Sequence, residues 1–214
     1  MSTSLLAERI ATRASRFRLV VSDSALSACA IYLHELARWN QRINLTALAL
    51  EPSIPDAAID KLVVEPLMAT TLLGSAPREW VDLGSGGGSP AIPLRIVWRG
   101  GLLTMVESRG RKCAFLRESV RQMGLARTSV CDARIEDFGA ERVQAAQEAG
   151  ADLAQLVTVR AVRIDESMVA LLVKLVAPRG FLLTFGSSVV GDAFVREADA
   201  LLPDESKVSL FRRR

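Results

Sequence analysis

The stretch VDLGSGGGSP, residues 81–90, limits the fold of this chain more than any other feature. It links an apolar run that ends at Asp82 to another that begins after Pro90, and four of its residues are glycine. Glycine loses more backbone entropy on folding than other residues, so this density indicates a backbone that turns tightly or approaches a ligand closely. Ser89 is the predicted N-cap, and Pro90 the predicted first residue, of a following helix. The stretch therefore predicts a strand, a glycine loop and a helix in direct succession.

Apolar runs and amphipathic stretches alternate along the chain after residue 79. Short apolar runs are typical of buried strands, and we predict strands in EWVDLG, LLTMVE, TSVCDA, AQLVTVRAV and FLLTF. Helices are predicted in SPAIPLRIV, in RKCAFLRESVRQM, which Gly124 ends, and in ESMVALLVKLV, which APRG ends. FGAERVQAAQEAG fits either a polar helix or a loop, and a last helix precedes the closing stretch KVSLFRR. This alternation predicts an α/β fold with a parallel, doubly wound sheet.

The N-terminal part shows helical patterns alone. Apolar residues recur at helical spacing over residues 24–39, where Ser22 or Asp23 can act as the N-cap. A second helix is predicted over residues 57–73, with a bend at Pro66.

The composition fits one core of ordinary size with a small appendage, since the chain has 214 residues of which 50% are hydrophobic. We therefore expect an N-terminal helical extension over residues 1–76 and a Rossmann-like domain over residues 77–214. The net charge of +3 is compatible with an anionic partner without requiring one.

The cysteines, the single histidine and the apolar runs bear on metal binding, membrane contact and cellular location. The 3 cysteines show no paired spacing, which argues against a disulfide framework or a zinc site; Cys113 and Cys131 are expected in the core. His34 falls in a helical pattern, and we expect a structural role for it. No apolar run approaches the ~18 residues of a membrane span, and the N-terminus is too charged for a signal peptide. We expect a cytoplasmic monomer without metal or membrane contact.

The residues around the glycines discriminate among ligands. A P-loop requires Lys and Ser or Thr after its last glycine, and a dinucleotide fingerprint requires a third glycine at position 89, which is Ser89. Asp82 would repel a pyrophosphate but suits a cation, and S-adenosylmethionine carries a sulfonium, an ammonium and no phosphate. Glu107 ends the next predicted strand, where an acid can hold ribose hydroxyls. S-adenosylmethionine is thus the predicted cofactor.

Five stretches then point to a family. RWNQRINLT (38–46), VDLGSGGGSPAIPL (81–94), VESRGRKCAFL (106–116), ARIEDF (133–138) and VRAV (159–162) resemble, in order and spacing, the RsmG family, also called GidB. The resemblance runs from about Trp39 to the end of the chain. It implies a class I, Rossmann-like, S-adenosylmethionine-dependent methyltransferase with an N-terminal helical extension. The implied reaction is methylation of N7 of a guanine in small-subunit ribosomal RNA.

The resemblance also implies roles for individual residues. Gly84, Gly86 and Ser89 would line the methionine and ribose part of the cofactor, Glu107 would hold the ribose, and Ile135 and Glu136 would flank the adenine. With Asp82 included, the full set of candidate cofactor-binding residues is Asp82, Gly84, Gly86, Ser89, Glu107, Ile135, Glu136 and Arg160.

Arg160 is the one candidate catalytic residue, placed by the resemblance near both cofactor and substrate. From the residues alone it is either a charge on the ligand side of the sheet or part of a structural ion pair. Guanine N7 presents a free lone pair, so transfer needs positioning and charge control rather than a general base. VRAV stands where a methylase of exocyclic amines usually has an Asn/Asp-Pro-Pro-aromatic turn, which disfavours an amine acceptor.

The RNA-binding side is less regular. Arg109, Arg111 and Lys112, and the closing FRRR, fit either phosphate contacts or a solvated surface. Trp39 is expected to be structural, since Trp is highly buried on average.

The chain also departs from the family at several positions. The family has a His in the helix before an Asp-Ser pair, where this chain has Ala57, and the Ser of that pair is replaced by Lys61. The family's Lys at the end of the fifth strand is Phe185 here, and its Gly before Ile-Pro-Leu is Ala91. We also expect that a strand is missing before KVSLFRRR. We therefore expect a divergent member that binds the cofactor normally but methylates the family's guanine slowly, with Phe185 able to stack on a base. Two alternatives stay open: a methyltransferase with another RNA or a small-molecule acceptor, and a cofactor-binding protein with weak catalysis.

Overall fold

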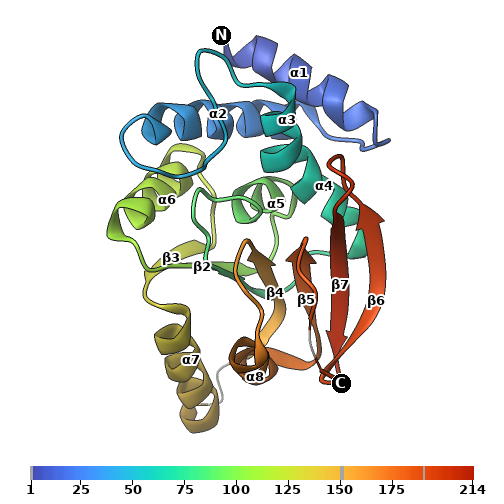
Figure 1. Cartoon of the computed structure of the whole chain (residues 1–214). Coiled ribbons are helices and arrows are strands. Elements are labelled where there is room, and N and C mark those ends of the chain that lie inside the picture. The colour runs from blue at the N-terminus through green and yellow to red at the C-terminus, as the bar shows by residue number, and fades with distance from the viewer. Residues whose placement is uncertain (1, 150–151, 190) are drawn as a thin grey trace.

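A seven-stranded sheet forms the centre of the computed structural model, which describes residues 2–149, 152–189 and 191–214. The strand order is β3-β2-β1-β4-β5-β7-β6, and β7 and β6 are the antiparallel members (Figure 1). The strands are β1 (Glu79–Leu83), β2 (Leu102–Glu107), β3 (Thr128–Asp132), β4 (Ala154–Arg160), β5 (Val176–Phe185), β6 (Phe194–Leu201) and β7 (Lys207–Arg213). The predicted α/β fold with parallel β1 to β5 is confirmed.

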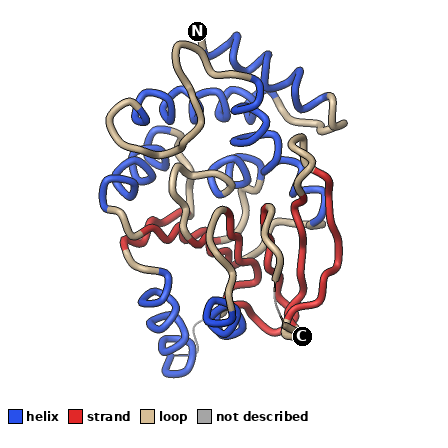
Figure 2. The backbone as a smooth tube through the Cα atoms, viewed as in Figure 1, coloured by secondary structure: helices blue, strands red, loops and turns tan. Residues whose placement is uncertain are grey.

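Helices cover both faces of this sheet (Figures 1 and 2). They are α1 (Thr3–Ser15), α2 (Asp23–Asn40), α3 (Asp56–Ile59), α4 (Glu65–Ala69), α5 (Ala91–Val97), α6 (Gly110–Gln122), α7 (Ile135–Ala149) and α8 (Glu166–Leu175). Successive strand residues point to opposite faces. Trp80 therefore packs with the N-terminal helices, α5 and α6, whereas Val81 packs with α7 and α8.

The N-terminal helices share a hydrophobic cluster with one face of the sheet. Helix α2 begins after Ser22, whose side chain accepts a hydrogen bond from Ala25 N, as one of the two predicted caps. The helix predicted over residues 57–73 runs from Asp56 to Leu72 and contains a π-helical turn, Asp60–Val64, directly before Pro66. Proline lacks an N–H and clashes with the preceding turn, which accounts for the irregularity at this place. The division at residues 76 and 77 stays a prediction.

Two predictions about the C-terminal part are wrong. The stretch FVREADAL forms the edge strand β6 instead of a last helix, so the strand that looked absent before KVSLFRRR is present. Its Glu, Ala and Leu residues favour a helix, but helix propensity is a weak preference that pairing with β7 overrides. The helix predicted in ESMVALLVKLV is α8, which ends at Leu175 as expected to within one residue, and APRG after it belongs to β5.

Other expectations are resolved more simply. The stretch that fits a polar helix or a loop belongs to helix α7 as far as Ala149, and Gly150 lies outside the described residues. Cys113 is buried as expected, whereas Cys131 is partly exposed because β3 is an edge strand. No helix in the described ranges is long and apolar enough to cross a membrane.

Candidate functional site

A cavity of about 410 Å³ opens at the carboxyl ends of β1, β2 and β4. Parallel α/β sheets bind their ligands at this edge, beside the point where the strand order reverses. Its walls combine the glycine loop, the ends of β2 and β4, the chain after α2 and the helical segment 56–72. It is lined by Leu45, Thr46, Ala47, Leu48, Lys61, Leu62, Gly84, Ser85, Gly86, Gly87, Ser89, Glu107, Lys112, Arg160 and Ala161.

The glycine loop is fixed by backbone hydrogen bonds. The amides of Gly84 and Ser85 both donate to Val106 O, at 2.9 and 3.0 Å. Gly84 has a φ of +72°, and a Cβ on it would lie 2.7 Å from Val162 Cγ2. Only glycine meets both conditions without strain. The hydroxyl of Tyr32, on α2, donates to Gly87 O at 2.7 Å, so the N-terminal helices also hold the loop.

Glu107 joins the end of β2 to the glycine loop. Its Oε2 accepts from Gly86 N and its Oε1 from Arg109 N, both at 2.9 Å. The side chain lines the cavity although the residue is 8% exposed. Each carboxylate oxygen has a second lone pair, so Glu107 can still accept hydrogen bonds from a ligand.

Asp82 lies beneath the loop and does not line the cavity. Its Oδ1 accepts from the Thr158 hydroxyl on β4, while Oδ2 has no hydrogen-bond partner among the described residues. Burial raises the pKa of Asp82 to about 6, and hydrogen bonding to Thr158 acts against that shift. A buried carboxylate with an unpaired oxygen is costly unless a donor or a cation compensates it.

Arg160 ends β4 and contacts three other segments. Its Nη1 donates to Ser89 Oγ at 3.0 Å, and its Nη2 forms an ion pair with Glu65 Oε2. The guanidinium carbon lies 4.9 Å from the ring centroid of Phe185 at the end of β5. Only 11% of the Arg160 side chain is exposed. From sequence, Arg160 was either a charge on the ligand side of the sheet or part of a structural ion pair. The structure shows that it is both, since it pairs with Glu65 and lines the cavity.

Two positions differ from what their side chains led us to expect. Ser89 is not the N-cap of α5: Pro90 occupies that place without a side-chain cap, and the Ser89 hydroxyl bonds Arg160. Phe185 is buried at 6% exposure under Arg160, so its ring is not available to stack on a base.

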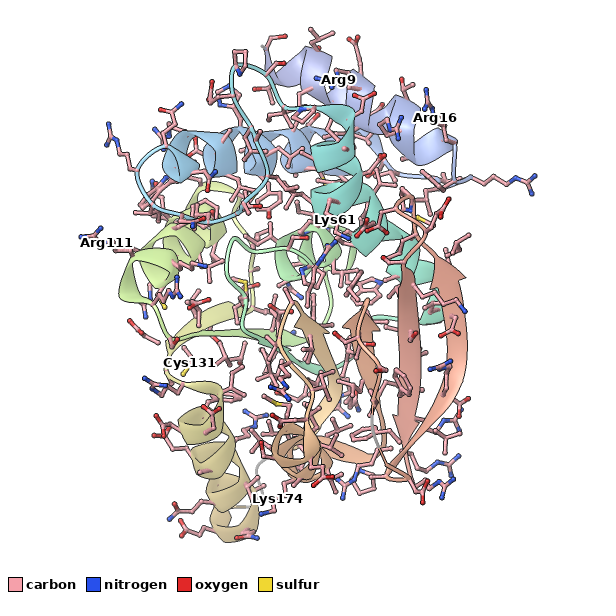
Figure 3. The ribbon with its side chains drawn as sticks, viewed as in Figure 1. Arg9, Arg16, Lys61, Arg111, Cys131 and Lys174 are labelled. Carbon is pink, nitrogen blue, oxygen red and sulfur yellow. The ribbon has the colours of Figure 1, made fainter. Side chains whose placement is uncertain are left out.

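Sequence reasoning missed Glu65 and the partners of Lys61. Glu65, at the start of α4, is 1% exposed. Lys61 lies on the helical segment 56–72 (Figure 3). Its Nζ is 3.3 Å from Glu65 Oε2 and 2.6 Å from Asp204 Oδ2, in the turn between β6 and β7. Burial raises the pKa of Glu65, and the charges of Arg160 and Lys61 act against that shift. The spacing of four residues between Lys61 and Glu65, which places both on one face of a helix, was the only local sequence signal for their pairing.

Ile135 and Glu136 begin α7, beside the loop but outside the cavity lining. Ile135 Cδ1 lies 3.9 Å from the position of a Cβ on Gly84, whereas Glu136 is exposed. The structure thus brings Ile135 to the glycine loop and leaves the Glu136 side chain in solvent.

Trp39 and Asn40, at the end of α2, lie outside the cavity lining. Trp39 is partly buried and packs edge-on against Phe115, with ring centroids 5.8 Å apart. Asn40 Oδ1 accepts from Leu45 N at 2.8 Å and so fixes the wall formed by the chain after α2.

The other positions singled out from the sequence differ in how far they are exposed to solvent. His34, Asn44 and Ala57 are exposed, and Ala91 is buried. Arg109 and Arg111 are exposed, and Figure 3 shows Arg111 pointing out from α6. Lys112 lines the cavity, with Nζ 4.0 Å from a Cβ on Gly86.

Comparison with solved structures identifies the fold as that of class I, Rossmann-like methyltransferases. A mutant of MtNAS in complex with S-adenosylmethionine matches with a TM-score of 0.57 and 14% identity, covering 97% of both chains. A putative methyltransferase, yhhF, from Escherichia coli matches with a TM-score of 0.54 and 13% identity, covering 69% of this chain and 82% of that one.

The family follows from the sequence. The family model GidB, described as rRNA small subunit methyltransferase G, matches residues 25–209, and the chain belongs to this family. The ribosomal RNA small subunit methyltransferase G of Stutzerimonas stutzeri is 31% identical over 132 residues, 62% of this chain and 60% of that protein. The protein of the same name from Stenotrophomonas maltophilia is 40% identical over 116 residues, 53% of this chain and 51% of that protein. The chain thus spans about half the length of the curated relatives it matches.

Proposed function

We propose that this protein transfers a methyl group from S-adenosylmethionine to small-subunit ribosomal RNA, at N7 of a guanine. The observation that carries the proposal is the cavity at the strand ends, which brings the glycine loop, Glu107 and Arg160 together. Membership in the rRNA small subunit methyltransferase G family supports the acceptor class. The chain would act as a monomer in the cytoplasm.

The residues that line the cavity, and Asp82 beneath its glycine loop, fit this cofactor. Oδ2 of Asp82 is buried and unpartnered, so a cation above the loop would offset a cost that the structure otherwise leaves unmet. Glu107 can accept from ribose hydroxyls and would repel a phosphate at the same place. Gly84 and Gly86 have positive φ, which favours glycine, so neither position carries a side chain beside the cavity.

The cofactor, when bound, supplies a methyl group on a positively charged sulfur, which makes its carbon electrophilic. The chain's own residues bind and orient. Gly84, Gly86 and Ser89 would line the methionine and ribose part, Glu107 would hold the ribose, and Ile135 with Glu136 would flank the adenine. Asp82 would stabilise positive charge from beneath the loop, because a buried charge is screened less than an exposed one.

Arg160 would orient the acceptor beside the cofactor and control charge during transfer. No proton leaves guanine N7 before attack, so no general base is required. The cavity lining agrees, because none of the described lining residues is His or Cys. Lys61 and Lys112 line the same cavity, and their charges suit an acceptor with anionic phosphates.

Slow transfer to the family's guanine stays a prediction, but its basis has changed. Phe185 packs beneath Arg160, and Lys61 pairs with Glu65 and Asp204. Both substituted residues therefore belong to the cluster of side chains around Arg160, and slow transfer would reflect a changed acceptor fit.

The test is methyl transfer with labelled cofactor to total RNA and to separated ribosomal subunits, followed by mapping of the modified nucleotide. We expect label at N7 of one guanine in small-subunit RNA, and none with Arg160→Ala. Label in another RNA or in a small molecule would identify a different acceptor. Tight cofactor binding without transfer to any fraction would indicate a cofactor-binding protein.

A further inference from the structure

We propose that Glu65 is a positioning residue for Arg160, and that Lys61 and Asp204 set how firmly Glu65 holds it. The proposal rests on the proposed function in one respect, since its effect on catalysis requires Arg160 to serve methyl transfer. The hold of Glu65 on Arg160, and the influence of Lys61 and Asp204 on that hold, do not depend on the function.

The ion pair between Glu65 and Arg160 is shielded from water. Glu65 comes from the helical segment 56–72 and Arg160 from the end of β4, so the pair joins the N-terminal helices to the sheet. Their side chains are 1% and 11% exposed. Charges at such depth are weakly screened, so each depends on the other for compensation. Ser89 and the Phe185 ring contact the same guanidinium and leave it few alternative orientations.

Lys61 and Arg160 share one carboxylate oxygen atom of Glu65, and hence its negative charge. Arg160 Nη2 and Lys61 Nζ both contact Glu65 Oε2. Lys61 is also bound by Asp204, whose Oδ1 accepts from Ser206 N and so belongs to a fixed turn. Asp204 thus draws Lys61 away from Glu65 and leaves more of the carboxylate charge to Arg160.

This arrangement predicts that removing the charge of Lys61 and removing the charge of Asp204 change the strength of the Glu65–Arg160 ion pair in opposite directions. Removing the Lys61 charge leaves Glu65 to Arg160 alone and tightens the hold. Removing the Asp204 charge transfers Lys61 to Glu65 and loosens the hold. The turn between β6 and β7 therefore acts on Arg160 through Lys61 and Glu65, although no residue of the turn lines the cavity.

The experiment compares Glu65→Gln, Lys61→Gln and Asp204→Asn with the wild type. Lys207→Gln is the matched control, because Lys207 lies on the same hairpin and faces Asp199, at 3.9 Å, away from the cavity lining. Hydrogen exchange of the Arg160 guanidinium is measured by NMR, with the signal assigned by its loss in Arg160→Lys. Cofactor affinity is measured by calorimetry, and single-turnover transfer with small ribosomal subunits.

We expect exchange at Arg160 to rise about tenfold in Glu65→Gln and transfer to fall about tenfold to a hundredfold, since small displacements of a positioned group have effects of that size. Cofactor affinity should change less than about threefold, because the glycine loop is untouched. Lys61→Gln should slow exchange, and Asp204→Asn should speed it, each by about twofold to threefold as for exposed ion pairs. Lys207→Gln should match the wild type.

If Glu65→Gln fails to fold, the opposite signs of the other two variants still decide. Unchanged exchange in Lys61→Gln and Asp204→Asn, or changes of the same sign, would overturn the proposal. A folded Glu65→Gln with wild-type transfer would overturn it as well. If the exchange pattern holds but not even the wild type transfers a methyl group, the positioning role stands and the proposed function fails.

Discussion

The two sides of the cavity are held by different kinds of contact. On the glycine-loop side, backbone amides bond to Val106 O and to the Glu107 carboxylate, all within β1, the loop and β2. On the Arg160 side, charged side chains from the helical segment 56–72, the ends of β4 and β5, and the β6–β7 turn contact one another. The first side is held mostly by contacts among β1, the loop and β2, with a bond from Tyr32 of α2 added, whereas the second exists only once distant segments have packed.

This difference implies a division of work. Backbone hydrogen bonds fix a shape that substitutions elsewhere hardly change, which suits recognition of an invariant cofactor. Side-chain ion pairs change with single substitutions, which suits a part that adapts to the acceptor. We therefore expect variants on the loop side to change cofactor affinity and variants on the Arg160 side to change transfer.

The largest effect is expected for Arg160→Ala. It removes the charge beside the acceptor and leaves buried Glu65 without its arginine partner. Single-turnover transfer should fall about a hundredfold to a thousandfold, as on loss of other preorganised charge-stabilising groups, while cofactor affinity measured by calorimetry should fall less than about fivefold. Arg16→Ala, at an exposed arginine directly after α1, is the control. An equal loss of affinity and transfer would end the proposed division.

The next largest effect is expected for Gly84→Val. A side chain at φ +72° is strained, and its Cβ would meet Val162 at 2.7 Å. Displacement of the loop should weaken cofactor binding about a hundredfold, which corresponds to about 3 kcal/mol. Gly74→Ala is the control, since a Cβ there meets no described atom within 4 Å. Wild-type affinity in folded Gly84→Val would remove the loop from the binding site.

A smaller effect is expected from the protonation of Asp82. Because its pKa is raised to about 6, the carboxyl becomes neutral as the pH falls from 7 to 5 and no longer attracts a cation. Cofactor affinity should fall about tenfold over this range. The stability contribution of Asp82 has the opposite sign, since the folded protein binds this proton more readily than the unfolded chain and gains stability as the pH falls through 6.

Unfolding is therefore not expected to explain the weaker binding at pH 5. Asp82→Asn should bind with an affinity that changes little between pH 7 and 5, whereas exposed Asp23→Asn should behave like the wild type. A slope in Asp82→Asn as steep as in the wild type would assign the titration to another group.

The same division explains what could be predicted from sequence. The glycine loop, Glu107 and the parallel strands follow from local patterns, because the loop lies between apolar runs in one continuous stretch. Arg160 could be named from its place at a strand end, but its partners Glu65 and Phe185 could not. They are 95 and 25 residues away in sequence, and only packing brings them together. Strand β6 was missed for a related reason, since pairing with β7 decides its conformation.

The smallest effect is expected for Tyr32→Phe. The lost hydroxyl leaves Gly87 O without the bond at 2.7 Å in a buried setting, which should lower the free energy of unfolding by about 1 kcal/mol and cofactor affinity about twofold to threefold. Ser15→Ala removes an exposed hydroxyl that donates to Thr12 O and serves as the control for thermal and calorimetric measurements. Unchanged stability and affinity would show that α2 does not support the loop through this bond.

The central claim is tested most directly by measuring cofactor affinity and single-turnover transfer at saturating cofactor in the same preparations of wild type, Glu107→Gln and Arg160→Lys. We expect Glu107→Gln to weaken affinity about tenfold, as for loss of a charged hydrogen-bond acceptor, with transfer at saturation within about threefold of wild type. Arg160→Lys should show the reverse, with transfer reduced at least about tenfold and affinity nearly unchanged, because lysine does not reproduce the planar guanidinium. Parallel losses of affinity and transfer in both variants would contradict the account, because the two sides of the cavity would then act as one.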